Sequence, residues 1–190
     1  LLLFGWYGFN AGSSLEANGL TALIILNTTV AASAAALAWT AGEWVFRGHP
    51  SLLGGASGMI AGLVAITPAC GFVGPGGAIL IGIAAGFLCL WAVVVLKSRF
   101  GYDDSLDVFG VHGVGGFIGT MAVAVFASTT FGGNVAGHAI GSQLGIQLLA
   151  AVIAIVWAGV VSWVILKAVD ALVGLRVDEN DEAQGLDLSE

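Results

Sequence analysis

The sequence predicts an all-α integral membrane protein, built as a polytopic helical bundle. Hydrophobic residues make up 58% of the chain and charged residues only 9%, whereas a soluble domain usually carries about 25% charged residues. The charged residues are also confined to a few short segments. The uncharged stretches cover residues 1–15, 17–42, 48–96 and 108–166. Because one helix needs about 20 apolar residues to cross a bilayer, the last two stretches are long enough for two spans each.

Helices fit these stretches better than the strands of a membrane barrel. Barrel strands are about 10 residues long and alternate apolar with polar positions. The runs here are continuous, rich in Ala, Leu and Gly, and show no alternation. We therefore predict six membrane helices, at about residues 1–13, 20–40, 51–69, 77–96, 105–127 and 139–172.

The first three helices are defined by their ends. The chain starts without Met and without a basic segment, so we expect that it begins inside a membrane helix and that further sequence lies upstream. The second helix is followed by the charged segment that contains Arg47. The third is expected to stop at Thr67-Pro68, because Pro and the glycines at 71, 74, 76 and 77 are strong helix breakers.

The last three helices differ in length. The fourth and fifth are of ordinary length for a membrane span and are separated by a charged segment at residues 97–107. The sixth would extend for about 50 Å at 1.5 Å per residue, which exceeds a hydrocarbon core of about 30 Å. We expect it to be tilted or kinked, or to project from the bilayer. Glycines at four-residue spacing in several spans favour close contact between helices.

The basic residues predict the orientation. All five lie on one side of the predicted topology, and the positive-inside rule makes that side cytoplasmic. They are Arg47, Lys97, Arg99, Lys167 and Arg176. The chain is thus expected to be a multi-pass protein of the cell (inner or plasma) membrane with a cytoplasmic C-terminus. Two regions follow, a transmembrane domain at residues 1–175 and a tail at 176–190.

The tail carries six acidic residues after Arg176 and no further basic one. Two interpretations remain open. The tail is either a solvated, disordered extension or a docking segment for a cytoplasmic partner.

His112 is the most informative single residue. It lies inside the fifth predicted span, between Gly110 and Gly113, which clear space around its ring. An ionisable side chain at this depth is costly and usually faces a cavity or a partner. Burial favours the uncharged imidazole, which is both a donor and an acceptor. A histidine bonded to a nearby backbone carbonyl is the alternative.

Trp6, Phe9 and Ser13 share one face of the first helix, since they are spaced i, i+3 and i+7. Two aromatic rings and a hydroxyl can hold a small cation, with each cation–π contact contributing about 0.5–2 kcal/mol. An interfacial aromatic belt explains the pattern equally well.

Three carboxylates lie at the cytoplasmic start of the fifth span: Asp103, Asp104 and Asp107. We expect them to cap free N–H groups of the helix, and an acidic mouth that attracts cations is the second interpretation. Polar residues inside other spans are candidates for lining a pathway, although most such groups bond to their own helix. They are Asn27, Thr28, Thr29, Ser57 and Thr67.

Other chemistry is not indicated. His49 and His138 fall at loop edges and are assigned no role, and Cys70 and Cys89 read as small buried hydrophobic residues. We find no motif for a metal, a cofactor, a nucleic acid or a catalytic nucleophile, so the sequence predicts no enzyme.

The motifs together resemble the ammonium transporter (Amt/Mep/Rh) family, in its bacterial Amt branch. The matching segments keep the order and spacing of that family's C-terminal half. They are GWYGFNAGS at 5–13, PSLLG at 50–54, AGLVAITPACG at 61–71, DDSLDVFGVHGVGG at 103–116, VGLRV at 173–177 and EAQGLD at 182–187. The resemblance implies that the chain forms the C-terminal six helices of an eleven-helix inverted-repeat transporter that assembles as a homotrimer.

The resemblance also implies roles for single residues. Trp6, Phe9 and Ser13 match an external recruitment site for ammonium, to which Trp6 also lends its indole N–H. His112 matches one of two pore histidines that share a hydrogen bond, the other lying in the first half of the family's chain. Three further positions are implied: Ser57 and Val108 near the inner end of the pore, and Asp104 as a structural acid on the cytoplasmic side.

The function implied is transport of ammonium or ammonia. Ammonium would be recruited outside, deprotonated, and passed as ammonia through a hydrophobic pore lined by histidines. A sensor that signals through its cytoplasmic side and an Rh-like channel for neutral gas are the alternatives. The implied partners are ammonium, ammonia, the lipid bilayer and a PII-type regulator that meets the tail.

Overall fold

The computed structural model describes residues 1–189 and gives an all-helical protein in that part of the chain. The predicted all-α class is therefore confirmed. Within the described residues, the only pairing of β type is an isolated bridge between Ser128 and Val135. The chain divides into two compact units, Leu1–Leu148 and Leu149–Glu190. Each unit is considered by itself.

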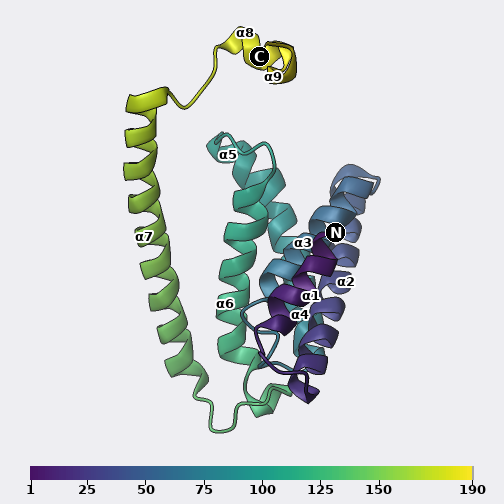
Figure 1. Ribbon diagram of the computed structural model, residues 1–190. Coiled ribbons are helices and arrows are strands. Elements are labelled where there is room, and N and C mark those ends of the chain that lie inside the picture. Colours follow the sequence, from purple (N-terminus) through teal and green to yellow (C-terminus); the bar gives the residue numbers. More distant parts are fainter. Residues whose placement is uncertain (190) are drawn as a thin grey trace. The chain divides into compact units, whose positions relative to one another are not determined.

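The first unit is a bundle of apolar helices (Figure 1). Its principal helices are α1 (Leu2–Gly12), α2 (Gly19–Arg47), α3 (Leu52–Ile66), α4 (Pro75–Trp91) and α6 (Val114–Phe126). Two π turns extend them. The first, η1 (Ala92–Leu96), joins α4 to the short helix α5 (Lys97–Phe100). The second, η2 (Phe109–Gly113), leads directly into α6.

Length and composition divide the six predicted spans into two groups. Four of them are long and apolar enough to cross a membrane: Gly19–Arg47, Pro75–Phe100, Phe109–Phe126 and Ile140–Val173. The helices α1 and α3 are shorter, with 11 and 15 residues. The helix α3 ends at Ile66, directly before the Thr67-Pro68 pair that was expected to break it.

Local sequence explains where α2 begins and ends. The side chain of Asn18 accepts hydrogen bonds from the backbone N–H groups of Leu20 and Thr21, which would otherwise lack partners at the start of the helix. Gly48 closes the other end in a left-handed conformation with φ of 79°, which glycine adopts without steric cost. The helix therefore runs seven residues beyond the predicted end at residue 40.

The core forms around α2, which packs against both α3 and α4. Glycines make these contacts close. A Cβ atom placed on Gly62 of α3 would lie 2.6 Å from the carbonyl oxygen of Ala31, and one on Gly86 of α4 would lie 2.5 Å from that of Ala35. The close approach expected from the glycine spacing is thus confirmed in these helices.

Two outer turns are tied to the bundle by asparagine side chains. Asn27 is fully buried, and its Nδ2 donates to the carbonyl oxygens of Cys70 at 2.8 Å and Val73 at 2.7 Å. The loop that follows α6 is held to the same turn, because Asn134 donates through its backbone N–H to Phe72 and through Nδ2 to Gly71. The turn after α3 is therefore fixed from two directions.

The helix α7 (Ile140–Val173) begins in the first unit and continues through the second. Its 34 residues correspond to about 51 Å at 1.5 Å per residue, as expected for the long last span. Among the described residues of α7, none is buried. Its outward side chains are thus available to lipid or to other protein surfaces.

The tail contains two short helices, α8 (Glu179–Gln184) and α9 (Leu186–Ser189). Part of the predicted tail thus forms short helices, and most of its described residues are exposed. Arg176 donates to both carboxylate oxygens of Glu182, at 2.8 and 3.0 Å, and this contact holds the pKa of that carboxyl below its usual value. The predicted border at residue 175 falls between α7 and α8.

Candidate functional site

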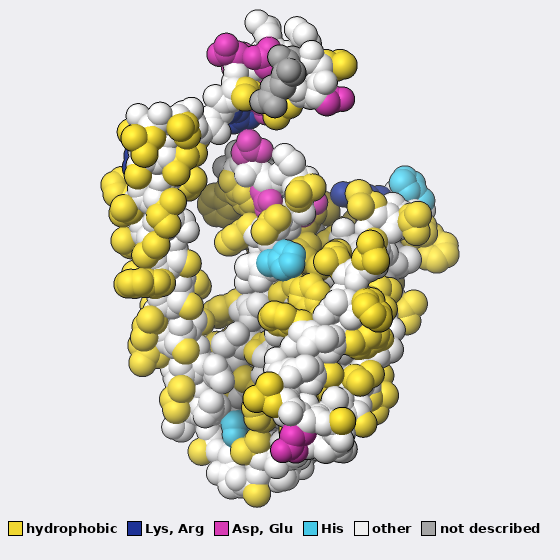
Figure 2. All heavy atoms as spheres, viewed as in Figure 1, with side chains coloured by type: hydrophobic (Ala, Val, Ile, Leu, Met, Phe, Trp, Pro, Cys, Tyr) yellow, Lys and Arg dark blue, Asp and Glu magenta, His cyan; other side chains and the backbone are white. Residues whose placement is uncertain are grey.

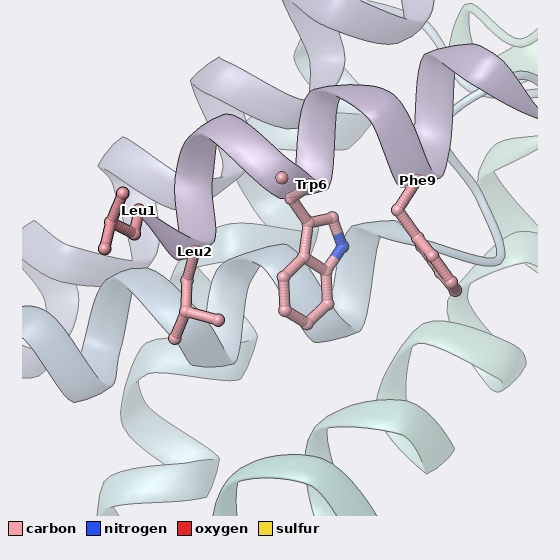
Figure 3. Close-up of a pocket in the computed structure, with 5 residues that line it drawn as sticks. Leu1, Leu2, Trp6 and Phe9 are labelled. Atoms are coloured by element: carbon pink, nitrogen blue, oxygen red, sulfur yellow. The ribbon is translucent and has the colours of Figure 1, made fainter.

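The aromatic residues of α1 open onto an apolar pocket. Trp6 and Phe9 extend from the same side of the helix (Figure 3), with ring centroids 6.0 Å apart and an interplanar angle of 62°. With Leu1, Leu2 and Gly5 they line a pocket of about 410 Å³. The Phe9 side chain is 65% exposed in this chain. The predicted shared face is thus present for Trp6 and Phe9, whereas Ser13, its third member, follows the last residue of α1 and does not line this pocket.

Trp6 is held in place from the end of α3. Its indole N–H donates to the hydroxyl of Thr67 at 2.8 Å, and that hydroxyl donates in turn to the carbonyl of Leu63 at 2.7 Å. This bond occupies the indole N–H that the resemblance assigns to ammonium. Only the π face of the ring is then left for a cation.

A second cavity lies on the other side of Phe9. It has a volume of about 240 Å³, and its lining includes Phe9, Asn10, Ser13, Ser14 and Thr67. The three hydroxyl groups donate their protons to backbone carbonyls of Phe9, Ala11 and Leu63. The Thr67 oxygen already accepts from the Trp6 indole, and the Ser14 oxygen contacts the Thr21 hydroxyl at 2.6 Å. The Ser13 oxygen keeps both lone pairs, and the Thr67 oxygen keeps one. A cavity lined in this way suits a ligand that only donates hydrogen bonds.

The polar residues within α2 link helices to one another. The Asn10 side chain donates to the hydroxyl of Thr28 at 3.1 Å, and the Tyr7 hydroxyl contacts that of Thr29 at 3.0 Å. Asn27 and Thr28 are both fully buried. These residues were candidates for lining a pathway, but the structure places them between elements. Thr28 and Thr29 join α2 to α1, and Asn27 joins α2 to the turn after α3.

His112 lies in the π turn η2, at the start of α6. Its neighbour Val111 is buried in the core, whereas the His112 side chain is exposed within the described chain. The expected burial of the imidazole is therefore not provided by residues 1–189. Val108, the other inner position on this segment, is 50% exposed, and Ser57 on α3 is partly buried.

Two of the three acidic residues near this segment, Asp104 and Asp107, have different tasks. Asp104 accepts hydrogen bonds from the backbone N–H groups of Val108 at 2.9 Å and Phe109 at 2.8 Å, which confirms the capping interpretation for this residue. For Asp107 that interpretation is wrong. Its φ of 57° turns it away from the helix, and its carboxylate pairs with the Lys97 ammonium at 2.7 Å.

Sequence reasoning missed Glu43. Its side chain is only 2% exposed and accepts hydrogen bonds from the backbone N–H and the hydroxyl of Ser51, at 2.8 and 3.0 Å. Arg47 lies 3.5 Å from it. Glu43 thus joins the end of α2 to the start of α3. Its isolation was the available signal, because it is the one acidic residue between positions 17 and 96.

His138 also has a contact that its loop position did not predict. Its Nε2 lies 2.8 Å from the carbonyl oxygen of Ala124. Since a carbonyl can only accept, Nε2 carries the proton. This carbonyl belongs to the last turn of α6, where backbone acceptors lack helical partners. His138 also lines a pocket of about 280 Å³ with Gln143 and Gln147.

These features define a polytopic α-helical membrane protein with uncharged, aromatic and imidazole side chains exposed along its helices. The family model described as Ammonium Transporter Family matches residues 1–190. The chain belongs to the Ammonium Transporter Family.

Individual relatives agree with this membership. The chain is 44% identical to an ammonium transporter of Bacillus subtilis, covering 100% of this chain and 48% of that protein. It is 47% identical to an ammonium transporter of Aquifex aeolicus, covering 97% and 44%. The chain thus spans about half the length of the curated relatives it matches.

Solved structures show the same arrangement of helices. One described as "Sensor Amt Protein" has a TM-score of 0.89 and 34% identity, and the match covers 100% of this chain and 46% of that one. The structure of Candida albicans Mep2 has a TM-score of 0.85 and 34% identity, with coverage of 95% and 42%.

Proposed function

We propose that this chain forms part of a pathway for ammonium and ammonia across the membrane. One observation carries the proposal. The side chains that the resemblance assigns to the substrate include Phe9, Val108 and His112, and all three are exposed although they lie in apolar helical segments. We infer that the part of the relatives' length that this chain does not span supplies the opposite wall.

The distribution of charge supports a pathway rather than a binding surface for ions. On the face of residues 1–148 that Figure 2 shows, charged side chains gather near the two ends, and hydrophobic and uncharged groups cover the middle. A charged ion at the centre of a bilayer costs about 2.5 kcal/mol or more, depending on water access. A neutral molecule costs far less, so the uncharged middle favours ammonia over ammonium.

The outer steps follow from the two cavities beside Phe9. Ammonium has four N–H donors and no acceptor, and it would meet the aromatic faces of Trp6 and Phe9 together with the hydroxyl oxygens of Ser13 and Thr67. Cation–π contacts of about 0.5–2 kcal/mol each would offset part of its lost hydration. The ammonium would then release a proton, which either returns to the water outside or crosses separately, and the ammonia would enter the pore.

The inner step assigns a role to His112. An uncharged imidazole donates one hydrogen bond and accepts another, so it offers ammonia a polar contact without a fixed positive charge. Potassium has no proton to release and would have to cross as an ion. Deprotonation therefore supplies the selectivity for ammonium over potassium.

The orientation and partners belong to the same proposal. The basic residues favour a cytoplasmic C-terminus. The family resemblance favours a homotrimer and a PII-type regulator that contacts the tail. The exposed acidic side chains of α8 and α9 would then be open to such a regulator, since Glu179 and Asp187 are exposed.

Substitution of Thr67 tests the outer site. In Thr67→Val the indole N–H of Trp6 loses its acceptor, which costs about 1 kcal/mol and frees the ring to rotate. We expect the ammonium concentration for half-maximal transport to rise roughly fivefold, the factor that corresponds to that energy. Thr67→Ser keeps the hydroxyl and should transport like the wild type. Equal half-saturation values for the two variants would remove Thr67 from the site.

Transport itself is tested by flux. The whole transporter, reconstituted in proteoliposomes, should accumulate labelled methylammonium or ammonium down a concentration gradient, and empty liposomes should not. A saturable binding response without flux would contradict the proposal and favour a sensor. Loss of the flux in Phe9→Asp, which places a carboxylate at the exposed ring position, would link transport to this chain.

A further inference from the structure

We propose that the two π turns of this chain, η1 and η2, form a paired support that sets the position of His112, with Val93 and Gly110 as its positioning residues. This rests on the proposed function, because that function gives His112 a place in the pathway. The support itself is argued from backbone geometry and packing alone.

Both turns depart from the α-helix in the same way. The backbone N–H of Lys97 bonds to the carbonyl of Ala92, and that of Val114 bonds to the carbonyl of Phe109, so each bond spans five residues. Such π turns are rare and often occur at functional sites. We therefore treat the packing of one π turn against the other as a feature related to function.

The π turn determines which way His112 faces. One residue corresponds to about 100° of rotation in an α-helix, and a π turn holds one residue more than an α turn. The extra residue in η2 thus rotates the residues that precede it by about 100° relative to α6. Val111 faces the core and His112 is exposed in this arrangement. Without the extra residue, Val111 and His112 would both be rotated by about 100° relative to α6.

Contact with η1 holds η2 in place. A Cβ atom on Gly110 would lie 2.7 Å from Cγ2 of Val93 and 3.3 Å from its backbone nitrogen. The backbone of one π turn therefore lies directly against the side chain of the other, with no room for an added methyl group. Gly110 is required here for space, since it is not among the residues with positive φ.

A second contact comes from α4. The buried thiol of Cys89 lies 3.9 Å from the carbonyl oxygen of Val111 and can donate a weak hydrogen bond to it. The carbonyl next to His112 is thus met by a donor from a neighbouring helix. Together, Val93 and Cys89 contact two consecutive residues within the π turn, Gly110 and Val111, directly before His112.

A double-mutant cycle tests the pair. Gly110→Ala adds a methyl group that overfills the contact, whereas Val93→Ala leaves a gap. In the double variant, the methyl group added at position 110 occupies the space vacated at position 93. We expect Gly110→Ala to lower ammonium flux by roughly 10- to 100-fold, because small displacements of a site residue have effects of that size. The ammonium flux of the double variant should recover to within about twofold of the wild-type flux. The effects of the two single substitutions would then be far from additive.

The pH profile separates positioning from simple loss of structure. Val93→Ala should keep normal amounts of folded protein but shift the pH dependence of flux, because His112 would move relative to its surroundings. Gly116→Ala on α6 is the matched control, since its added Cβ would lie 4.0 Å from Val64 of α3, which is an ordinary contact. It should leave both flux and pH profile unchanged.

Failure of the paired support can be distinguished from failure of the proposed function. His112→Ala is measured in parallel, and wild-type flux and selectivity in that variant would overturn the role of His112 itself. If His112→Ala is impaired, a Gly110→Ala variant that behaves like Gly116→Ala overturns the paired support. Should Gly110→Ala fail to fold, a wild-type pH profile in Val93→Ala overturns it, and a folded, transporting double variant supports it.

Discussion

Replacing Asn27 with aspartate is expected to lower the free energy of unfolding by about 2–6 kcal/mol, since two buried carbonyls lose their donors at about 1–3 kcal/mol each. The Nδ2 group of Asn27 donates to the carbonyls of Cys70 and Val73 from a fully buried position. Aspartate has nearly the same shape but, when ionised, has no donor. It would place a negative charge against two carbonyl oxygens.

Thermal unfolding of the purified protein in detergent measures this effect. Thr40→Val is the control on the same helix, because the Thr40 hydroxyl bonds only to the carbonyl of Ala36 in its own helix. Its substitution should change stability by less than about 0.5 kcal/mol. Similar unfolding of the two variants would mean that Asn27 does not secure the turn after α3.

The second large effect is expected at Gly62. A Cβ atom there would lie 2.6 Å from both the carbonyl oxygen of Ala31 and the Cβ of Ala35. One of these contacts is with backbone, so a side-chain rotation cannot relieve it. Gly62→Ala should therefore separate α3 from α2 and reduce stability by about 1–3 kcal/mol, despite alanine's better helix propensity.

Gly55 offers the matched comparison on α3. An added Cβ at that position would lie 3.7 Å from the Thr40 hydroxyl oxygen, which is an ordinary contact. Gly55→Ala is thus expected to be neutral or slightly stabilising, by up to about 1 kcal/mol. If Gly62→Ala proves as stable as Gly55→Ala in the same unfolding assay, close packing of α2 and α3 through Gly62 is refuted.

Sequence reasoning worked where one local rule dominates. Uncharged runs predicted the long helices, and Thr67-Pro68 marked the end of α3. The spacing of Trp6 and Phe9 predicted their shared face, because residues three positions apart are neighbours on a helix surface. The capping role of Asp104 followed from its place before a helix.

The remaining features depend on contacts between segments far apart in the chain. The partner of Trp6 is Thr67, which lies 61 positions away. Asp107 faces Lys97 because of a backbone conformation, with φ of 57°, that nothing in its residue type requires. Glu43 is buried because Ser51 returns to meet it. Such pairings follow from tertiary packing, which local patterns do not specify.

The π turns are the clearest example. The segment containing His112 is rich in glycine, which disfavours a regular helix but does not specify a π turn. The register shift of η2 occurs where it packs against η1. Sequence could therefore identify His112 as a residue of interest but could not predict which way its side chain faces. Its exposure within residues 1–189 was likewise not predicted.

The most direct test of the pathway compares ammonium and potassium flux through the whole transporter before and after His112→Ala. Proteoliposomes with equal amounts of folded protein are given each cation in turn, and the initial rates are measured. If His112 offers ammonia an uncharged polar contact, ammonium flux falls or its excess over potassium flux narrows. Unchanged ammonium flux together with unchanged selectivity against potassium would contradict the account.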